Sequence, residues 1–197
     1  MADTHCKPTD WILTSSGVMF RPLAPAVQDV YICDVAHALA NICRFGGHAS
    51  SFYSVAQHSV LVSHECPGYE LAALLHDAQE AYLGDIPRPL KRTTTFAAYR
   101  DAEAHLEAVI HRAFGVVMEP DGVVSIALAD RRMLRTEQRD LMPAAAPGED
   151  RSDVAPYQYI ITPWTPDVAR NAFMERFVEL VLSPHAQGDG DHGVLTA

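Results

Sequence analysis

The stretch Leu71-Ala-Ala-Leu-Leu-His-Asp-Ala-Gln-Glu80 decides the fold. Its first five residues are apolar, and an imidazole and a carboxylate, those of His76 and Asp77, follow them directly. We expect a helix from Glu70 to Leu83, ended by Gly84, with these polar groups at its inner end. Burying both groups costs free energy unless something compensates them. A divalent cation does so, because it accepts the imidazole lone pair and neutralises the carboxylate. The stretch therefore predicts a metal site on a buried helix.

The remaining ligands of such a site must come from other helices, since adjacent helical residues point about 100° apart. His58 is a polar residue inside the apolar run Val55-Ala-Gln-His-Ser-Val-Leu-Val62. Asp130 ends a third apolar run, Ile126-Ala-Leu-Ala-Asp. Separate hydrogen bonds in the core would explain any one of these residues, but all of them together favour a shared site. The predicted metal ligands are His58, His76, Asp77 and Asp130. Two imidazoles and two carboxylates suit one divalent ion and do not decide between Co²⁺, Mn²⁺, Zn²⁺, Ni²⁺, Fe²⁺ and Mg²⁺.

The rest of the chain predicts more helices and one hairpin. Trp11 to Phe20 form two short strands around a Ser-Ser-Gly turn. Further helices are expected from a cap at Asp34 to about Cys43, from a capping box at Ser54 to about Glu65, and over residues 96–114, 125–141 and 166–182. We expect an all-α fold with a small N-terminal β-hairpin, in a single domain over residues 1–183. Its metal-binding core spans residues 34–141, and residues 184–197 are expected to be a disordered tail.

Composition and charge exclude several classes of partner. Of the 197 residues, 48% are hydrophobic and 20% are charged, as in a globular protein. The formal net charge of −10 argues against binding a nucleic acid polymer, which an acidic protein repels. The basic residues Arg88, Lys91 and Arg92 form a modest cluster that suffices for a small phosphorylated ligand.

The chain also lacks the usual signals for export or membrane insertion. Its first residues carry no basic region followed by an apolar stretch, and no apolar run is long enough to span a bilayer. The cysteines are scattered, with no Cys-x-x-Cys pair. These features predict a cytoplasmic protein with no membrane association.

The order His…His-Asp…Asp on successive helices resembles the HD-domain metal-dependent phosphohydrolases, from about Asp34 to Leu141. Within that superfamily, Leu74-Leu-His-Asp-Ala-Gln-Glu-Ala-Tyr-Leu-Gly-Asp-Ile-Pro-Arg-Pro-Leu-Lys91 looks like the branch of small nucleotide hydrolases. That branch includes a bacterial deoxyribonucleoside 5′-nucleotidase, a phage dATP triphosphohydrolase and the phosphohydrolase of oxetanocin biosynthesis. Its pattern is His-Asp, then Glu three residues on, then Gly-Asp-x-Pro-x-Pro-x-Lys, and this sequence keeps every element. The resemblance implies an HD-domain helical bundle and a homo-oligomer.

The resemblance also implies roles for residues around the metal. Glu80, one helical turn beyond the His-Asp pair, and Asp85 are the candidate catalytic groups, which orient the attacking water and take its proton. A solvated helix face for Glu80 and a turn cap for Asp85 are the structural alternatives. Lys91 and Arg44 are the candidate phosphate contacts, and Phe45 is placed to stack on a base or sugar.

The predicted function is hydrolysis of the 5′-phosphate ester of a (deoxy)nucleotide by a metal-activated water. Release of phosphate from a monophosphate and release of triphosphate from a triphosphate both stay open. The alternative is a non-catalytic metal or nucleotide sensor on an HD scaffold, against which the intact Glu80 and Asp85 argue. Hydrolysis of cyclic dinucleotides or (p)ppGpp is disfavoured, because we find no additional histidine ligands or basic signature segments.

Overall fold

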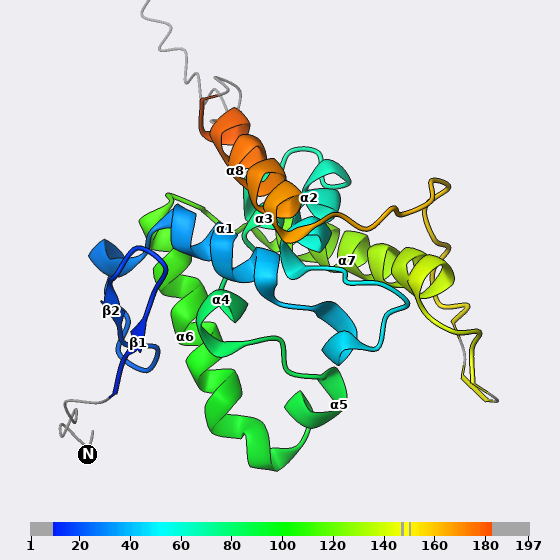
Figure 1. Cartoon of the computed structure of the whole chain (residues 1–197), viewed down its shortest axis with the longest axis horizontal. Helices are drawn as coiled ribbons and strands as arrows, with labels where there is room; N and C mark the ends of the chain where they lie inside the picture. The colour runs from blue at the N-terminus through cyan, green and yellow to red at the C-terminus, as the bar shows by residue number, and fades with distance from the viewer. Residues whose placement is uncertain (1–9, 147, 150, 183–197) are drawn as a thin grey trace, which may run out of the picture.

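The computed structural model describes residues 10–146, 148–149 and 151–182, and it is mostly helical with one small hairpin (Figure 1). This confirms the predicted fold class; the tail expected over residues 184–197 lies outside the described residues. The hairpin pairs β1 (Ile12–Leu13) with β2 (Met19–Phe20) in antiparallel register. The helices are α1 (Ile32–Asn41), α2 (Val55–His64), α3 (Glu70–Leu74), α4 (Glu80–Leu83), α5 (Arg88–Lys91), α6 (Ala97–Ala113), α7 (Pro120–Leu141) and α8 (Pro166–Leu182). Short 3-10 helices cover η1 (Val27–Asp29), η2 (Arg44–Gly47) and η3 (Thr94–Phe96).

Asp34 fastens the hairpin to α1, and the prediction that it caps this helix is wrong. The helix begins at Ile32, so that Asp34 lies in its first turn, 2% exposed. The Asp34 carboxylate accepts hydrogen bonds from Ser15 Oγ at 2.5 Å, from Ser16 N at 2.7 Å and from Ser16 Oγ at 2.6 Å. Burial alone would raise the pKa of Asp34, but these hydroxyl donors outweigh it and hold the pKa below its usual value.

The continuous helix predicted from Glu70 to Leu83 is also wrong, because the chain leaves the helix at the His-Asp pair. Nδ1 of His76 lies 2.7 Å from the carbonyl oxygen of Ala73, the group that would accept from the amide of Asp77 in an unbroken α-helix. The next backbone bonds span three residues, as from Glu80 N to the oxygen of Asp77 at 3.0 Å. The imidazole of His76 thus takes the place of the Asp77 amide as the donor to Ala73, and the His-Asp pair lies outside the helix.

Helix α7 begins five residues before the predicted start at Ser125. Pro120 occupies the first turn, where its missing N–H has no cost. Gly122 lies against the ring of Tyr69, and an added Cβ would come within 2.7 Å of that ring. Proline and glycine here begin and pack a helix instead of breaking one.

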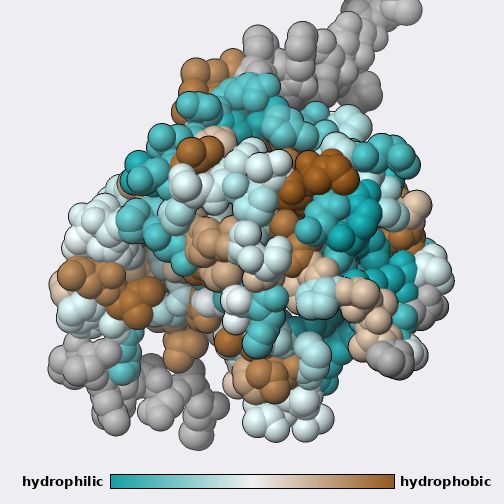
Figure 2. Space-filling model, turned by 45° about the vertical axis from the view of Figure 1, so that its right-hand side comes forward, coloured by the Kyte–Doolittle hydropathy of each residue, from teal (hydrophilic) through white to brown (hydrophobic). Residues whose placement is uncertain are grey.

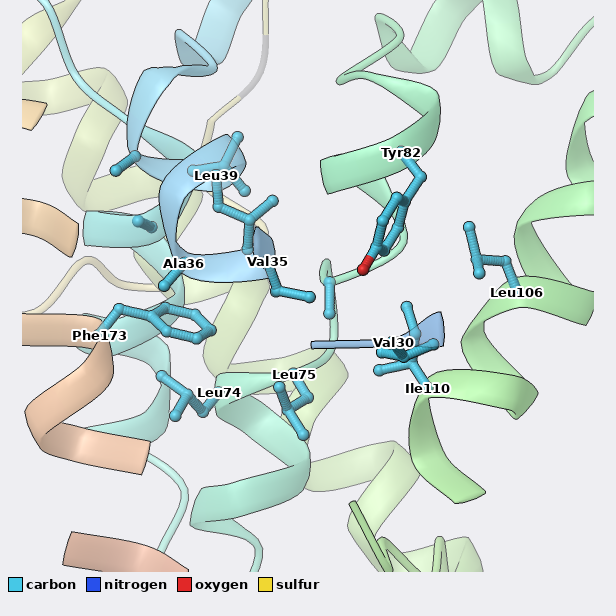
Figure 3. Close-up of a cluster of buried hydrophobic side chains, with 14 of the residues drawn as sticks. Val30, Val35, Ala36, Leu39, Leu74, Leu75, Tyr82, Leu106, Ile110 and Phe173 are labelled. Atoms are coloured by element: carbon cyan, nitrogen blue, oxygen red, sulfur yellow. The ribbon is translucent and has the colours of Figure 1, made fainter. Parts of the chain in front are cut away.

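Two hydrophobic clusters hold the helices together. In the first, apolar residues from α1, α3, α6 and α8 converge with Tyr82 of α4, as Figure 3 shows for Leu39, Leu74, Ile110 and Phe173. Fully burying one such side chain stabilises the fold by about 1.5–3 kcal/mol. The second cluster packs α2 and α3 against α7. Together they fix α2, the break after α3, and α7 relative to one another, and these are the elements that carry the predicted ligands.

The surface carries no continuous apolar band on the face drawn in Figure 2, where brown residues are scattered among teal ones. Singly exposed apolar residues are normal for a folded protein. Among the described residues, no helix combines the length and the apolar composition needed to cross a bilayer.

Candidate metal centre

Three predicted ligands come together between α2 and the break after α3. Donor atoms of His58, His76 and Asp77 all lie within 4.8 Å of one another. Nε2 of His58 is 3.3 Å from Nε2 of His76 and 3.7 Å from Oδ2 of Asp77. The same Asp77 oxygen is 3.2 Å from Nε2 of His76. The fold therefore brings together donors that lie on different elements, eighteen residues apart in the chain.

The spacing of these donors suits one metal ion. Two donors that each lie about 2.1 Å from an ion, at tetrahedral or octahedral angles, are about 3.0–3.4 Å from each other. The separations among His58, His76 and Asp77 range from 3.2 to 3.7 Å. Two imidazoles and a carboxylate are also the donor types that divalent transition metals prefer. This group can hold a metal ion.

Both imidazoles are oriented through their other nitrogen. Because a carbonyl oxygen only accepts, Nδ1 of His76 carries the proton that it donates to Ala73. Nδ1 of His58 lies 2.6 Å from a carboxylate oxygen of Glu137. The two Nε2 atoms thus lie 3.3 Å apart, and their lone pairs can bind one cation together.

The fourth predicted ligand, Asp130, projects from α7 beside His58. Its Oδ1 lies 3.3 Å from Nε2 of His58, and its Oδ2 lies 3.6 Å from Nη2 of Arg88. Asp130 is not one of the three residues whose donors are mutually within 4.8 Å. The structure therefore groups three of the four predicted ligands and places the fourth next to one of them.

The charges of this centre are strongly coupled. Burial would lower the pKa of His76, but the adjacent Asp77 raises it to about 9. Burial would raise the pKa of Asp77 and of Asp130, yet the imidazoles of His58 and His76 hold both well below the usual range. The ionisation of each of these groups therefore depends on the charge of its neighbours.

Glu80 lies at the start of α4 with only 4% of its surface exposed. Its Oε1 lies 3.3 Å from Nζ of Lys91, and its Oε2 has no hydrogen-bond partner among the described residues. Burial, followed by the negative charges of Asp77 and Asp85, raises the pKa of Glu80 to about 9. Glu80 therefore lies close to the centre with one oxygen unused. Asp85 is half-buried, and its negative charge is one of the causes that raise the pKa of Glu80. Lys91 also contacts Oε1 of Glu103, at 2.6 Å.

Arg44 reaches the centre from the turn before α2, and Phe45 follows it in the chain. Nη2 of Arg44 lies 3.0 Å from Oε2 of Glu137, and Nη1 lies 3.7 Å from Oδ2 of Asp77. The guanidinium also lies over the ring of Phe45, 5.6 Å from its centroid. Phe45 has a φ of 57°, a left-handed backbone that non-glycine residues rarely adopt. Arg44 is thus paired with carboxylates of the centre.

Sequence reasoning missed Glu137, Tyr53 and Glu103. Glu137 follows Asp130 by two helical turns on the same face of α7, which is a signal that the sequence contains. Tyr53 donates to Oε1 of Glu137 at 3.0 Å and lies in an irregular segment, and Glu103 is one of several charged residues on α6. Nothing in their local sequence distinguishes these last two.

The fold and the site define a mostly helical protein with a preformed His-His-Asp group that can bind a metal ion. No protein-family model matches the chain. It is 40% identical over 179 residues to the protein YfdR of Escherichia coli (strain K12), in a match that covers 86% of this chain and 95% of YfdR. The chain therefore belongs to the family of YfdR. It is also 38% identical over 116 residues to RCAP_rcc00048 of Rhodobacter capsulatus, covering 54% of this chain and 59% of that protein. Both relatives are named as uncharacterized proteins.

Proposed function

We propose that this protein is a metal-dependent phosphohydrolase that cleaves the 5′-phosphate ester of a (deoxy)nucleotide. The observation that carries the proposal is the pair of Nε2 atoms of His58 and His76, 3.3 Å apart and facing the carboxylate of Asp77. The buried, half-satisfied carboxylate of Glu80 next to this group supports a reaction over a purely structural site, which has no need of a proton acceptor. The resemblance to the HD-domain phosphohydrolases supports the same class.

The proposed metal ligands are the four that the sequence indicates, His58, His76, Asp77 and Asp130. A divalent ion held by these residues would supply a Lewis acid for the phosphate and would lower the pKa of a bound water molecule. Glu80 accepts the proton of the attacking water, and Asp85 helps to orient that water. Burial, followed by the charges of Asp77 and Asp85, raises the pKa of Glu80, so a cation bound to Asp77 would remove one of these causes.

The proposed substrate contacts are two cations, Lys91 and Arg44, and one aromatic ring, Phe45. Lys91 is held by Glu80 and Glu103, and a phosphate oxygen that binds Lys91 takes the place of one of these contacts. Arg44, whose Nη1 lies 3.7 Å from Oδ2 of Asp77, adds a second positive charge. Phe45, beside Arg44, offers a surface for a base or sugar. Monophosphates, yielding nucleoside and phosphate, and triphosphates, yielding nucleoside and triphosphate, both fit this proposal.

The test is a panel of nucleoside mono-, di- and triphosphates incubated with protein loaded separately with Co²⁺, Mn²⁺, Zn²⁺, Ni²⁺, Fe²⁺ or Mg²⁺. We expect release of phosphate or of triphosphate with at least one ion, identified by phosphorus NMR. A chelated sample and the Asp77→Ala variant serve as matched controls without metal. Tight nucleotide binding without turnover, with every ion, would contradict the proposal and favour a sensor.

A further inference from the structure

Glu137 is the most deeply buried carboxylate near the centre, with no exposed surface. Its Oε1 lies 2.6 Å from Nδ1 of His58 and accepts a hydrogen bond from the hydroxyl of Tyr53 at 3.0 Å. Its Oε2 accepts from Nη2 of Arg44 at 3.0 Å. Both oxygens are therefore satisfied, and Glu137 is not among the residues His58, His76 and Asp77 that can hold a metal ion.

We propose that Glu137 is a positioning residue for the metal centre: it keeps the proton of His58 on Nδ1, so that the lone pair of Nε2 faces the ion. A carboxylate on the far nitrogen of a metal-binding histidine fixes the ring orientation and strengthens the imidazole as a ligand. The inference rests on the metal-binding part of the proposed function, and it assigns a role to a residue outside the ligand set.

Stability alone does not account for this arrangement. A buried carboxylate–guanidinium pair adds little net stability, because removing both charges from water offsets their attraction. The contact with His58 is the shortest of those that Glu137 makes, and it involves the one ring nitrogen that does not face the other ligands. The orientation of His58 is thus the clearest consequence of having Glu137 here.

Arg44 extends this arrangement to a second ligand. Its guanidinium lies 3.0 Å from Glu137 through Nη2 and 3.7 Å from Asp77 through Nη1. Because the guanidinium is rigid and planar, it fixes the position of the Glu137 carboxylate relative to that of Asp77. His76 is fixed differently, through the backbone oxygen of Ala73. Glu137 is therefore the side chain through which mutation can test histidine positioning without changing the backbone.

The first experiment compares Co²⁺ binding by the wild-type protein and by Glu137→Gln, using calorimetry on metal-free samples. Donors from Arg44, Tyr53 and His58 all point at Glu137, so the amide nitrogen of glutamine meets a donor in either orientation. We expect Co²⁺ affinity to fall by about 10–100-fold. Tyr53→Phe, which removes one donor and leaves the contact with His58, should weaken binding by less than this.

Asp34→Asn is the matched control, because Asp34 is also a buried, hydrogen-bonded carboxylate but lies on the hairpin side of α1. We expect this variant to keep wild-type Co²⁺ affinity. Equal affinity of the wild type and a folded Glu137→Gln would overturn the positioning role while leaving the metal centre intact. A wild type that binds none of the ions would instead overturn the proposed function itself.

The second experiment reads the tautomer of His58 directly by ¹⁵N–¹H NMR of the metal-free protein, at a pH where the imidazole is neutral. We expect the proton on Nδ1 in the wild type and in Asp34→Asn, and a shift of the proton towards Nε2 in Glu137→Gln. This readout requires neither metal nor turnover, and it applies to the wild type even where a variant fails to fold. A wild-type His58 protonated on Nε2 would overturn the inference.

Discussion

Asp34 and Glu80 are almost equally buried, 2% and 4% exposed, yet their surroundings are opposite. Asp34 receives hydrogen bonds from two serines on the hairpin turn, and its pKa lies below the usual value. Glu80 has a lysine on one oxygen, no hydrogen-bond partner among the described residues on the other, and a pKa raised to about 9 by burial and like charges. A carboxylate that only joins two elements is saturated with donors, whereas one with an unused oxygen among other acids is suited to exchange a proton.

The largest effect is expected from a substitution in the metal centre, compared with one in the region of Asp34. Asp77→Ala removes the carboxylate that lies 3.2 Å from His76 and 3.7 Å from His58. We expect Co²⁺ binding and the proposed phosphohydrolase activity to fall below detection, by calorimetry and by product release. Asp34→Asn should retain both. Metal binding that survives Asp77→Ala would place the ion elsewhere.

Glu80→Gln should separate catalysis from metal binding. We expect the rate to fall by about 10²–10⁴-fold, the usual contribution of a general base, while Co²⁺ affinity changes little because Glu80 is not a proposed ligand. Full activity in Glu80→Gln would remove Glu80 from the mechanism.

The same variant should alter how stability depends on pH in the metal-free protein. Because the pKa of folded Glu80, about 9, exceeds the value of 4.5 expected when unfolded, the folded state holds a proton that the unfolded state has released. The contribution of Glu80 to the free energy of unfolding is therefore fully present below pH 4.5 and is lost as the pH rises to about 9. Denaturant unfolding across this range should show a shallower decline for Glu80→Gln than for the wild type. An unchanged slope would contradict the buried, protonated state of Glu80.

Asp34→Asn should show the opposite pH dependence and a loss of about 2 kcal/mol of unfolding free energy at neutral pH. The pKa of folded Asp34 lies below its usual 3.8, so its stabilising effect is present above that pH and is lost as the pH falls through the folded value. Thermal unfolding should therefore separate the wild type from the variant at pH 7 and bring them together in strong acid. A constant difference at all pH values would contradict this.

The smallest effect is expected at Glu103, which holds Lys91 at 2.6 Å. Glu103→Gln removes a charge that competes with phosphate for this lysine. We expect KM to fall by about threefold with kcat nearly unchanged, since a partly exposed ion pair is worth only about 0.2–1 kcal/mol. A rise in KM would show instead that Glu103 positions Lys91.

The local sequence predicted the helical class and the hairpin from caps, apolar spacing and turn residues. It also predicted that His58 groups with the His-Asp pair, because these polar residues lie within apolar runs. It did not predict the helix break at His76, which depends on a side chain capturing the carbonyl of Ala73. Arg44 and Glu137 are 93 residues apart, and no local pattern predicts that they pair. Contacts of that range follow from packing α2 and α7 together, so they appear only in the folded chain.

Anomalous diffraction at the cobalt edge from crystals of the Co²⁺-loaded protein tests the metal centre most directly. We expect one peak about 2.0–2.3 Å from Nε2 of His58, Nε2 of His76 and a carboxylate oxygen of Asp77, with Asp130 completing the set. A peak away from these residues, or none while His58 and His76 keep their mutual contact, would contradict the central claim.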